Sequence, residues 1–526
     1  MRSPIFLLQI VATATAMRGV LRPRMMVATS PLPSLAADKP APSRQGPTSL
    51  PLKIDGDWYD AGSYADDHPG GRWLMEYARG RDVTALFYSV HMNRERLARA
   101  ALDRLPKLDA ASLPLPPRPG LSPSELEQLA SSPRQGDGRE SAALLQGPYV
   151  FSYDAAPSDE TPIPRVDSPL RRDLQAFMQR RFPTRASAKA TPAMWARIAL
   201  FGAGTIACWL GWLQGSLAYT LALPFVHWGL IAHTVHEATH GNLSNDPRVN
   251  FWLQFTSHPI CFNVFVWIPQ HLMSHHQYTN DYKFDCDCHH FAPALISDEH
   301  PRAPAAGRVN QAWTFVWKAF LVTLGTSILQ PMRTLLEKPT PNYDVNITPV
   351  PQAVSKRTLL LSVLPSFLVM LYPLVMGALG AFAPLQAAVC TVYPWVAMSL
   401  IFTTMTQVSH VQRQTMPTHD ARRGERCWTA RQITTSLDYS MPANGHAPSA
   451  LETSVSTAYC AGLNAQSLHH AMPSISCAHF PAIYEEYAAI CERHDVPLRT
   501  SRHYGTAVRE MLQYLFDNNR PAPVER

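Results

Sequence analysis

The residues best suited to chemistry in this chain are histidines, grouped at spacings that suit metal ligands. Side chains three or four residues apart share one face of a helix, and the members of a doubled histidine point in two directions. The groups read H-x-x-x-H, H-x-x-x-H-H and Q-x-x-H-H, with one further histidine alone. The candidate catalytic residues are His236, His240, His271, His275, His276, Gln466, His469 and His470, and the candidate metal ligands are these histidines together with His410.

The number of imidazoles indicates more than one metal ion. They supply far more nitrogens than one tetrahedral zinc uses, and imidazole binds zinc, copper, iron and nickel alike. His236-Glu237-Ala238-Thr239-His240 also fits the H-E-x-x-H pattern of zinc peptidases. The extended peptidase pattern fails, because Leu243 and Asp246 stand where glycine and histidine should be. A membrane zinc peptidase remains the more distant alternative, and it leaves the other clusters unexplained.

Some histidines outside these groups have plainer interpretations. His227 and His258 are alone in apolar surroundings and are expected to be hydrogen-bonded structural residues, while His233 suits a core position or a place beside the ligands. His479 is a candidate for positioning the third group. The segment Asp285–His290 could form an extra metal site, although we favour a polar loop with incidental cysteines.

A second type of site is indicated by residues 51–106, a compact block centred on His68-Pro69-Gly70-Gly71 and followed by His91. A haem iron held from both sides needs two imidazoles on opposed segments. Gly70 and Gly71 would let the backbone approach a flat ligand closely. The alternative is a small α/β domain with two surface histidines.

Long apolar runs must position the histidine groups. The candidate membrane spans are 195–213, 216–233, 358–380 and 385–405, each near the roughly 20 residues that a bilayer needs. Lysines and arginines gather at one end of these runs, which places that end in the cytosol or an equivalent compartment. If 251–268 and 312–330 are interfacial helices, all the histidine groups lie on the same, positive face. The alternative is a set of buried core helices in a soluble protein.

The remaining segments are polar. Residues 1–50 are expected to be a targeting leader or a disordered tail, residues 107–190 a proline-rich linker and pre-membrane segment, and residues 486–526 a C-terminal cytosolic tail. The nine cysteines, odd in number and scattered, argue against a disulfide framework and favour a reducing compartment. The basic residues form no dense tract of the kind that binds nucleic acid.

The block 51–106 resembles the cytochrome b5 family, because H-P-G-G, the G-x-D-x-T of Gly80–Thr84 and a following Phe87 recur in order. The resemblance implies haem b, held axially by His68 and His91, with Gly70 and Gly71 beside it. Residues 190–485 resemble membrane fatty acid desaturases of the front-end class, which carry an N-terminal cytochrome b5 domain and Gln as the first residue of the third histidine box. The step from His271 to His276, followed by Tyr278-Thr279-Asn280, is most similar to delta-5 members.

This resemblance implies a fold and an activity. The expected fold is a small α+β haem domain, then a membrane domain (191–485) that is all-α and multi-pass, with about four transmembrane and two interfacial helices. The expected enzyme uses two non-haem irons and O2 to introduce a cis double bond into a polyunsaturated fatty acyl lipid or acyl-CoA. Its electrons would come through the haem from an NADH-cytochrome b5 reductase-type donor. The expected location is the membrane of the endoplasmic reticulum, with the plastid as the alternative.

One departure from the family pattern stands out, since Leu468 replaces the glutamate that usually precedes the paired histidines. A carboxylate that would orient an imidazole is therefore missing or comes from elsewhere. A fatty acid hydroxylase or a sphingolipid desaturase of the same di-iron type stays open. So does a non-catalytic, membrane-anchored haem electron carrier, in which replacing His469 would leave function intact.

Overall fold

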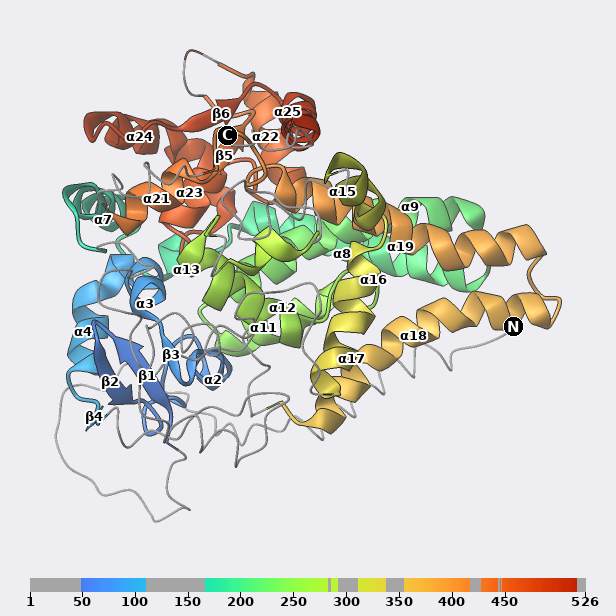
Figure 1. The fold of residues 1–526 in the computed structure, drawn as a ribbon, viewed down its shortest axis with the longest axis horizontal. Coiled ribbons are helices and arrows are strands. Elements are labelled where there is room, and N and C mark those ends of the chain that lie inside the picture. Colours follow the sequence, from blue (N-terminus) through green and yellow to red (C-terminus); the bar gives the residue numbers. More distant parts are fainter. Residues whose placement is uncertain are drawn as a thin grey trace, which may run out of the picture.

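The computed structural model describes residues 49–109, 166–281, 285–291, 311–336, 354–416, 427–442, 445 and 447–517. Nearly all of the expected leader and most of the expected linker lie outside the described residues. The described chain forms a small haem-type module, a helical arm, and a helical body between them that carries the histidines (Figure 1).

The first module is α+β, as expected. Its elements are β1 Pro51–Ile54, β2 Asp57–Asp60, α2 Arg72–Ala78, β3 Arg81–Asp82, α3 Thr84–Val90, α4 Glu95–Leu102 and β4 Lys107–Leu108. The strands lie in the order β3-β1-β2-β4, with β1 parallel to β3 and antiparallel to β2. Leu52 and Ile54 of β1 are buried together with Phe87 and Tyr88 of α3, so this module has an apolar core of its own.

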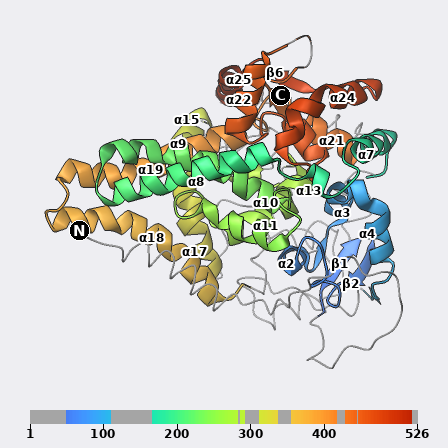
Figure 2. The same cartoon turned by 180° about the vertical axis from the view of Figure 1, so that it is seen from behind.

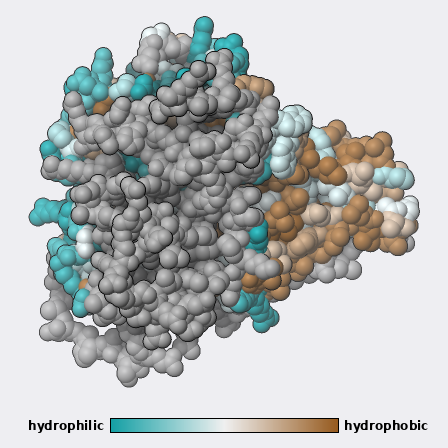
Figure 3. Space-filling model, viewed as in Figure 1, coloured by the Kyte–Doolittle hydropathy of each residue, from teal (hydrophilic) through white to brown (hydrophobic). Residues whose placement is uncertain are grey.

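Long apolar helices form the arm of the molecule. They are α8 Pro192–Leu213, α9 Leu217–Ile231, α18 Lys356–Ala378 and α19 Pro384–Gln407, and α9 packs against both α8 and α19. Among the described residues, α8, α18 and α19 are long and apolar enough to cross a membrane. Leu379 and Leu385, at the tip of the arm, are 74% and 73% exposed. If the arm did not lie in a membrane, these apolar side chains would face water. The exposed surface of the arm is predominantly apolar in Figure 3.

The expected spans and interfacial helices need some revision. The run at 216–233 forms α9, which is only 15 residues long, but the helix continues through a π-helical turn, Ala232–His236, into α10 Glu237–Thr239. The run at 312–330 forms α15 Gln311–Ala319 and a second helix, Val322–Leu335, bent by 62°. If that bent pair crosses the membrane, the spans among the described residues number four rather than three.

The run at 251–268 is not one continuous helix. It breaks into α11 Pro247–Leu253 and α12 Val264–Ile268, joined by a 3-10 turn and a loop. Val264, Phe265 and Ile268 are buried in the same apolar cluster as the core of the first module. Hydrophobicity alone cannot tell a surface that faces lipid from one that faces another part of the protein, which is why the sequence did not predict this packing.

The C-terminal part completes the body. Its elements are α21 Trp428–Thr434, β5 Leu437–Tyr439, α22 Ala450–Cys460, α23 Gln466–Ala471, α24 Phe480–Arg493, β6 Arg499–Ser501 and α25 Tyr504–Asp517. The expected tail boundary at residue 485 falls inside α24, and β6 pairs in parallel with β5. Residues 486–517 are therefore packed into the body, which is not strictly all-α. The other short helices are α13 His276–Tyr278, α16 Val322–Leu324 and α17 Gln330–Leu335.

The segment before the arm fastens the first module to the body. It contains α7 Pro169–Arg181, whose N-cap Ser168 accepts a hydrogen bond from Arg171 N. Arg171 is buried, donates to Tyr88 O at 3.1 Å and pairs with Glu95 at 2.7 Å. Asn93 of the module donates to Phe182 O at 2.7 Å. In both Figure 1 and Figure 2 the module lies beside α7 and the histidine-bearing helices.

Candidate metal centre and haem site

The three histidine groups, far apart in sequence, meet at one end of the helical arm. His236 ends the π-helical turn after α9, and His240 follows α10. The second group lies on the π-helical turn Pro269–His275 and on α13, and the third on α23. The π-helical turns rotate the side chains relative to a regular helix, and such turns are frequent at functional sites.

One cluster draws on all three groups. The potential ligand atoms of His236, His240, His271, His276 and His469 lie within 4.8 Å of one another. The Nε2 atom of His271 is 3.0 Å from that of His240 and 3.2 Å from that of His276. Neither ring nitrogen of His236 has a hydrogen-bond partner, although both are buried. A shared metal ion satisfies such converging nitrogens at once, so this cluster fits a metal bound by imidazoles.

The electrostatics of this cluster suit metal binding. Burial and the neighbouring imidazoles hold the pKa values of His240, His271 and His276 well below the usual range. Burial is the larger cause, because it penalises the charged ring. These imidazoles are therefore neutral at physiological pH, which is the state that ligates a metal.

A second cluster lies directly beside the first. It contains His275, His410 and His470, all buried, with ligand atoms within 4.8 Å of one another. The Gln466 Nε2 atom lies 2.9 Å from His410 Nε2 and 3.1 Å from His470 Nε2. Each doubled histidine is split between the clusters: His275 and His470 belong to the second, and His276 and His469 to the first. The isolated His410 thus joins the site, as the sequence predicted.

Partners behind the second cluster orient its rings. The Asp285 carboxylate lies 3.0 Å from His275 Nδ1 and also accepts from Asn280 N at 2.8 Å. Gln432 Oε1 lies 2.9 Å from His470 Nδ1, and Thr435 O lies 3.2 Å from His410 Nδ1. With Nδ1 engaged in this way, each ring presents Nε2 to the centre of the cluster. Neither Asp285 nor Gln432 was assigned a role from the sequence, although Asp285 begins the segment Asp285–His290 that stood out in it.

These contacts answer the question raised by Leu468. That side chain is fully buried in the apolar core, and the orienting carboxylate comes from Asp285 instead. The segment around Asp285 also brings Cys286, Asp287 and His290 within 4.8 Å of one another. An additional metal site there stays the alternative to a polar loop with incidental cysteines, whereas the contact of Asp285 with His275 is present in the structure.

Glu237, the glutamate of H-E-x-x-H, faces away from the metal clusters. Its two carboxylate oxygens lie 3.2 and 3.3 Å from Cys477 N, in the segment that follows the third histidine box. Burial raises the pKa of Glu237 to about 7 despite hydrogen bonds from Ser476 and Cys477. A zinc peptidase needs this carboxylate beside the metal-bound water, so the observed orientation disagrees with that alternative.

The four single histidines that the sequence set apart from these groups have structural contacts. His227 Nε2 lies 2.8 Å from Thr256 O, and His233 Nδ1 lies 2.8 Å from Gly229 O. His258 Nδ1 is 3.4 Å from Ser257 Oγ. His479 Nε2 lies 2.9 Å from Lys189 O, which ties the segment after the third box to the segment before α8. These four histidines lie outside the two ligand clusters.

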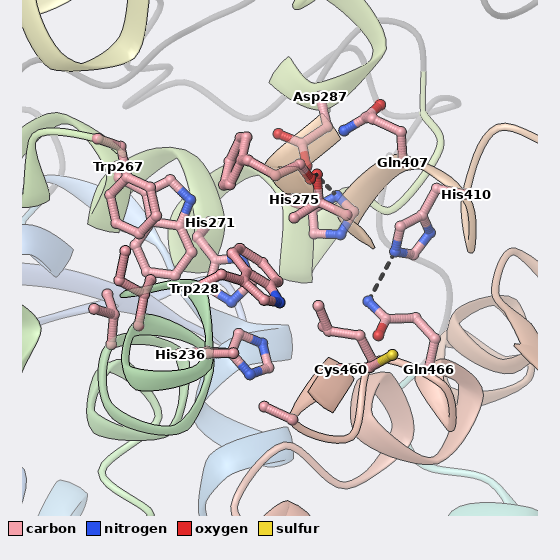
Figure 4. Close-up of a pocket in the computed structure, with 18 of the residues that line it drawn as sticks. Trp228, His236, Trp267, His271, His275, Asp287, Gln407, His410, Cys460 and Gln466 are labelled. Atoms are coloured by element: carbon pink, nitrogen blue, oxygen red, sulfur yellow. Dashed lines mark hydrogen bonds and ion pairs between the residues drawn. The ribbon is translucent and has the colours of Figure 1, made fainter. Parts of the chain in front are cut away.

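A cavity opens onto both clusters, and its lining is more apolar than polar. Its apolar walls come from α9 and the π-helical turn after it, from α12 and the loop before it, from α19 and from the turn after α22. They include Trp228, Val235, Phe262, Trp267 and Phe402. Its polar side is formed by His236 and His271 together with His275, His410 and Gln466 (Figure 4). The cavity thus joins an apolar space to the imidazoles.

The candidate haem ligands face each other across a gap in the first module. The ring centroids of His68 and His91 are 6.0 Å apart, and the rings come from opposite sides, before α2 and after α3. His91 Nδ1 lies 2.8 Å from Phe87 O, which leaves Nε2 free to bind iron. A Cβ on Gly70 would come within 2.9 Å of the His68 ring, and Gly71 has a φ of +90°. These features fit a haem between the two rings.

The haem module is placed close to the metal clusters. Helix α3, which His91 follows directly, packs against α13, which begins with His276. Tyr77 of α2 donates to Phe265 O at 3.5 Å, and the Trp73 and Phe251 rings are 6.1 Å apart. A helix next to a candidate haem ligand therefore lies against a helix that carries a candidate ligand of the metal clusters.

Comparison with known proteins agrees with this geometry. The family model described as fatty acid desaturase matches residues 210–502, and the model described as cytochrome b5-like haem/steroid binding domain matches residues 43–118. The chain is 28% identical to an acyl-lipid omega-13 desaturase of Chlamydomonas reinhardtii, covering 91% of this chain and 96% of that protein. It is 27% identical to a chloroplastic acyl-lipid (7-3)-desaturase of the same alga, covering 85% and 76%.

A further relative is an acyl-lipid (8-3)-desaturase of Mortierella alpina, 23% identical over 88% of this chain and 92% of that protein. No solved structure was found to match the chain. The family match covers more than half of the chain, and it agrees with the two histidine clusters and the haem-type module. The chain belongs to the fatty acid desaturase family and is an oxidoreductase that carries a fused cytochrome b5-like domain.

Proposed function

We propose that this desaturase is a front-end enzyme that introduces a cis double bond into a polyunsaturated acyl chain, on the carboxyl side of existing double bonds. The observation that carries the proposal is the apolar cavity that ends at two adjoining imidazole clusters. An acyl chain suits apolar walls of this kind, and a centre built from imidazoles suits iron.

The eight clustered histidines hold two irons in this proposal, with Gln466 at the edge of the second cluster. When bound, the irons supply the reduction of O2 and the removal of one hydrogen from each of two neighbouring CH2 groups. The protein places the chain and excludes water. Trp267 stacks on His271 with ring centroids 4.4 Å apart, so the ligand ring and the apolar wall hold each other in position.

Electrons reach the site through haem b between His68 and His91. The packing of α3 against α13 supports this route, because it places the helix that precedes His91 beside the helix that carries His276. The source of electrons in this proposal is an NADH-cytochrome b5 reductase-type protein.

The substrate is a fatty acyl group, and we favour an acyl lipid over acyl-CoA because the relatives reported above are named acyl-lipid desaturases. Delta-5 regiochemistry stays a prediction that rests on the second histidine box. We propose the endoplasmic reticulum as the location. The plastid remains the alternative, and one relative is named chloroplastic. Hydroxylation, or action on a sphingoid base, would use the same metal centre and is tested by the same products.

The test is a fatty-acid profile of yeast that expresses the full chain and is fed a panel of polyunsaturated acids. Mass spectrometry would locate any new double bond or hydroxyl group. His240→Ala and His68→Ala should each abolish the product. His503→Gln, on a histidine that pairs with Glu452 away from the site, should leave it unchanged. A hydroxylated product, a modified sphingoid base, or product formation that survives His240→Ala would overturn the proposal.

A further inference from the structure

Arg185 belongs to the segment before the membrane domain, yet its side chain reaches the haem module. Its Nη2 donates to Pro69 O at 3.0 Å, and Pro69 directly follows the haem ligand His68 in the sequence. Its Nη1 lies 3.5 Å from Asn245 O in the loop between α10 and α11. One guanidinium therefore spans the haem-binding loop and the desaturase body.

The backbone around Arg185 is held firmly. Thr184 and Ser187 exchange hydrogen bonds, with Thr184 N donating to Ser187 Oγ at 3.2 Å and Ser187 N donating to Thr184 Oγ1 at 3.1 Å. The next residues are tied to the body, because Ala190 N donates to Asn242 O at 2.9 Å. On the other side, Arg94 of the haem module donates to Pro183 O at 2.9 Å. The position of the guanidinium is thus set by both parts of the protein.

The charge of Arg185 lies beside the candidate haem-binding loop, because its guanidinium donates to the carbonyl of the residue that follows His68. The guanidinium is itself partly buried, so solvent screens this field less than it would at an open surface.

We propose that Arg185 completes the haem site from outside the cytochrome b5-like domain, and that its positive charge raises the reduction potential of the haem. This inference rests on the haem binding of the proposed function. Ferric haem carries one more positive charge than ferrous haem, so a fixed cation nearby destabilises the oxidised form. Charge and burial around the haem are among the means by which a protein tunes its potential. The module would therefore acquire its working potential only when docked on the desaturase body.

The experiment is a spectroscopic redox titration of the full chain, purified in detergent, with the Soret and α bands as the readout. Arg185→Gln removes the charge, while Arg185→Lys keeps it and loses the forked geometry. Arg180→Gln is the matched control, because Arg180 lies in the same segment but pairs with Glu486 on the exposed surface. We expect Arg185→Gln to shift the midpoint to more negative potential, and Arg185→Lys and Arg180→Gln to stay near the wild type.

Each outcome decides the inference. Loss of haem from Arg185→Gln, with haem retained at the wild-type potential in Arg185→Lys, also supports it. A wild-type midpoint in Arg185→Gln overturns it. Equal shifts or equal haem loss in the glutamine and lysine variants overturn it as well, because the charge would then not be what matters. If the wild-type protein itself shows no bis-imidazole haem spectrum, the haem binding of the proposed function fails instead.

Discussion

The imidazole of His276 is stacked on that of His470, with ring centroids 4.4 Å apart and an angle of 15° between the planes. The two rings belong to different ligand clusters, and they come from boxes separated by almost two hundred residues. The stack therefore makes one rigid unit of the two clusters. A change at either histidine box is expected to disturb both metal positions rather than one.

Asp285 should act as a positioning residue for the second cluster. Asp285→Asn weakens the contact with His275 Nδ1 and removes the negative charge behind that ring. Loss of such a partner costs roughly 10–100-fold in metal affinity or activity. We expect the variant to lose non-haem iron, measured by elemental analysis, while its haem spectrum is unchanged. Asp167→Asn, at an exposed aspartate, is the control, and full iron content in Asp285→Asn would contradict the assignment.

Glu237 distinguishes the desaturase from the peptidase interpretation of the first box. Because its carboxylate is directed at Cys477 N, Glu237→Gln should retain iron and most of the desaturase activity, with at most a loss of stability. His236→Ala, four positions before His240, should lose both iron and activity. The measurements are iron content and product formation. A complete loss of activity in Glu237→Gln, with iron retained, would argue that this carboxylate takes part in the chemistry.

The cavity can be made smaller at Ala232, a small buried residue in its wall. Ala232→Leu adds three carbons to a space that the acyl chain is proposed to fill, so turnover should fall at least about 10-fold, as for a misplaced substrate. Ala218→Leu is the matched control, since Ala218 is exposed on the same helix. Product formation and haem and iron content are measured together. Unchanged activity in Ala232→Leu would mean that the acyl chain lies elsewhere.

The carboxylate of Asp438 is expected to make the free energy of unfolding depend on pH. Its buried carboxylate accepts from Ser467 N at 2.8 Å and from Tyr484 Oη at 2.5 Å, and burial raises its pKa to about 6 despite these bonds. A folded-state pKa above the unfolded value means that the folded protein binds more protons, so this residue's contribution to stability falls as pH rises from about 4 to about 6.

Asp438→Asn keeps the shape of the side chain without the titration. The melting temperature of the wild type should therefore fall relative to that of the variant as pH rises from about 4 to about 6, because only the wild type has to ionise this buried carboxylate. The readout is thermal unfolding of the purified chain at several pH values. Parallel melting curves for the two proteins across this range would show that Asp438 does not titrate there.

Much of this protein can be predicted from local patterns in the sequence. The histidine groups, the haem ligand pair and the long apolar helices are each encoded within a few tens of residues. Spacing along a helix and runs of apolar residues indicate the histidine groups and the apolar helices, and the resemblance to cytochrome b5 implies the haem ligand pair. The splitting of each doubled histidine between two directions follows from the same local geometry, and the structure confirms it.

Contacts between distant segments were decided only by the tertiary structure. Asp285 behind His275, Glu237 against Cys477, and Arg185 over the haem loop all depend on how separate elements pack. The break in the run at 251–268 and the packing of the residues after 485 were not predicted, for the same reason. The polarity of a residue predicts the kind of surroundings that it needs. It does not predict which part of the chain, or which solvent, provides those surroundings.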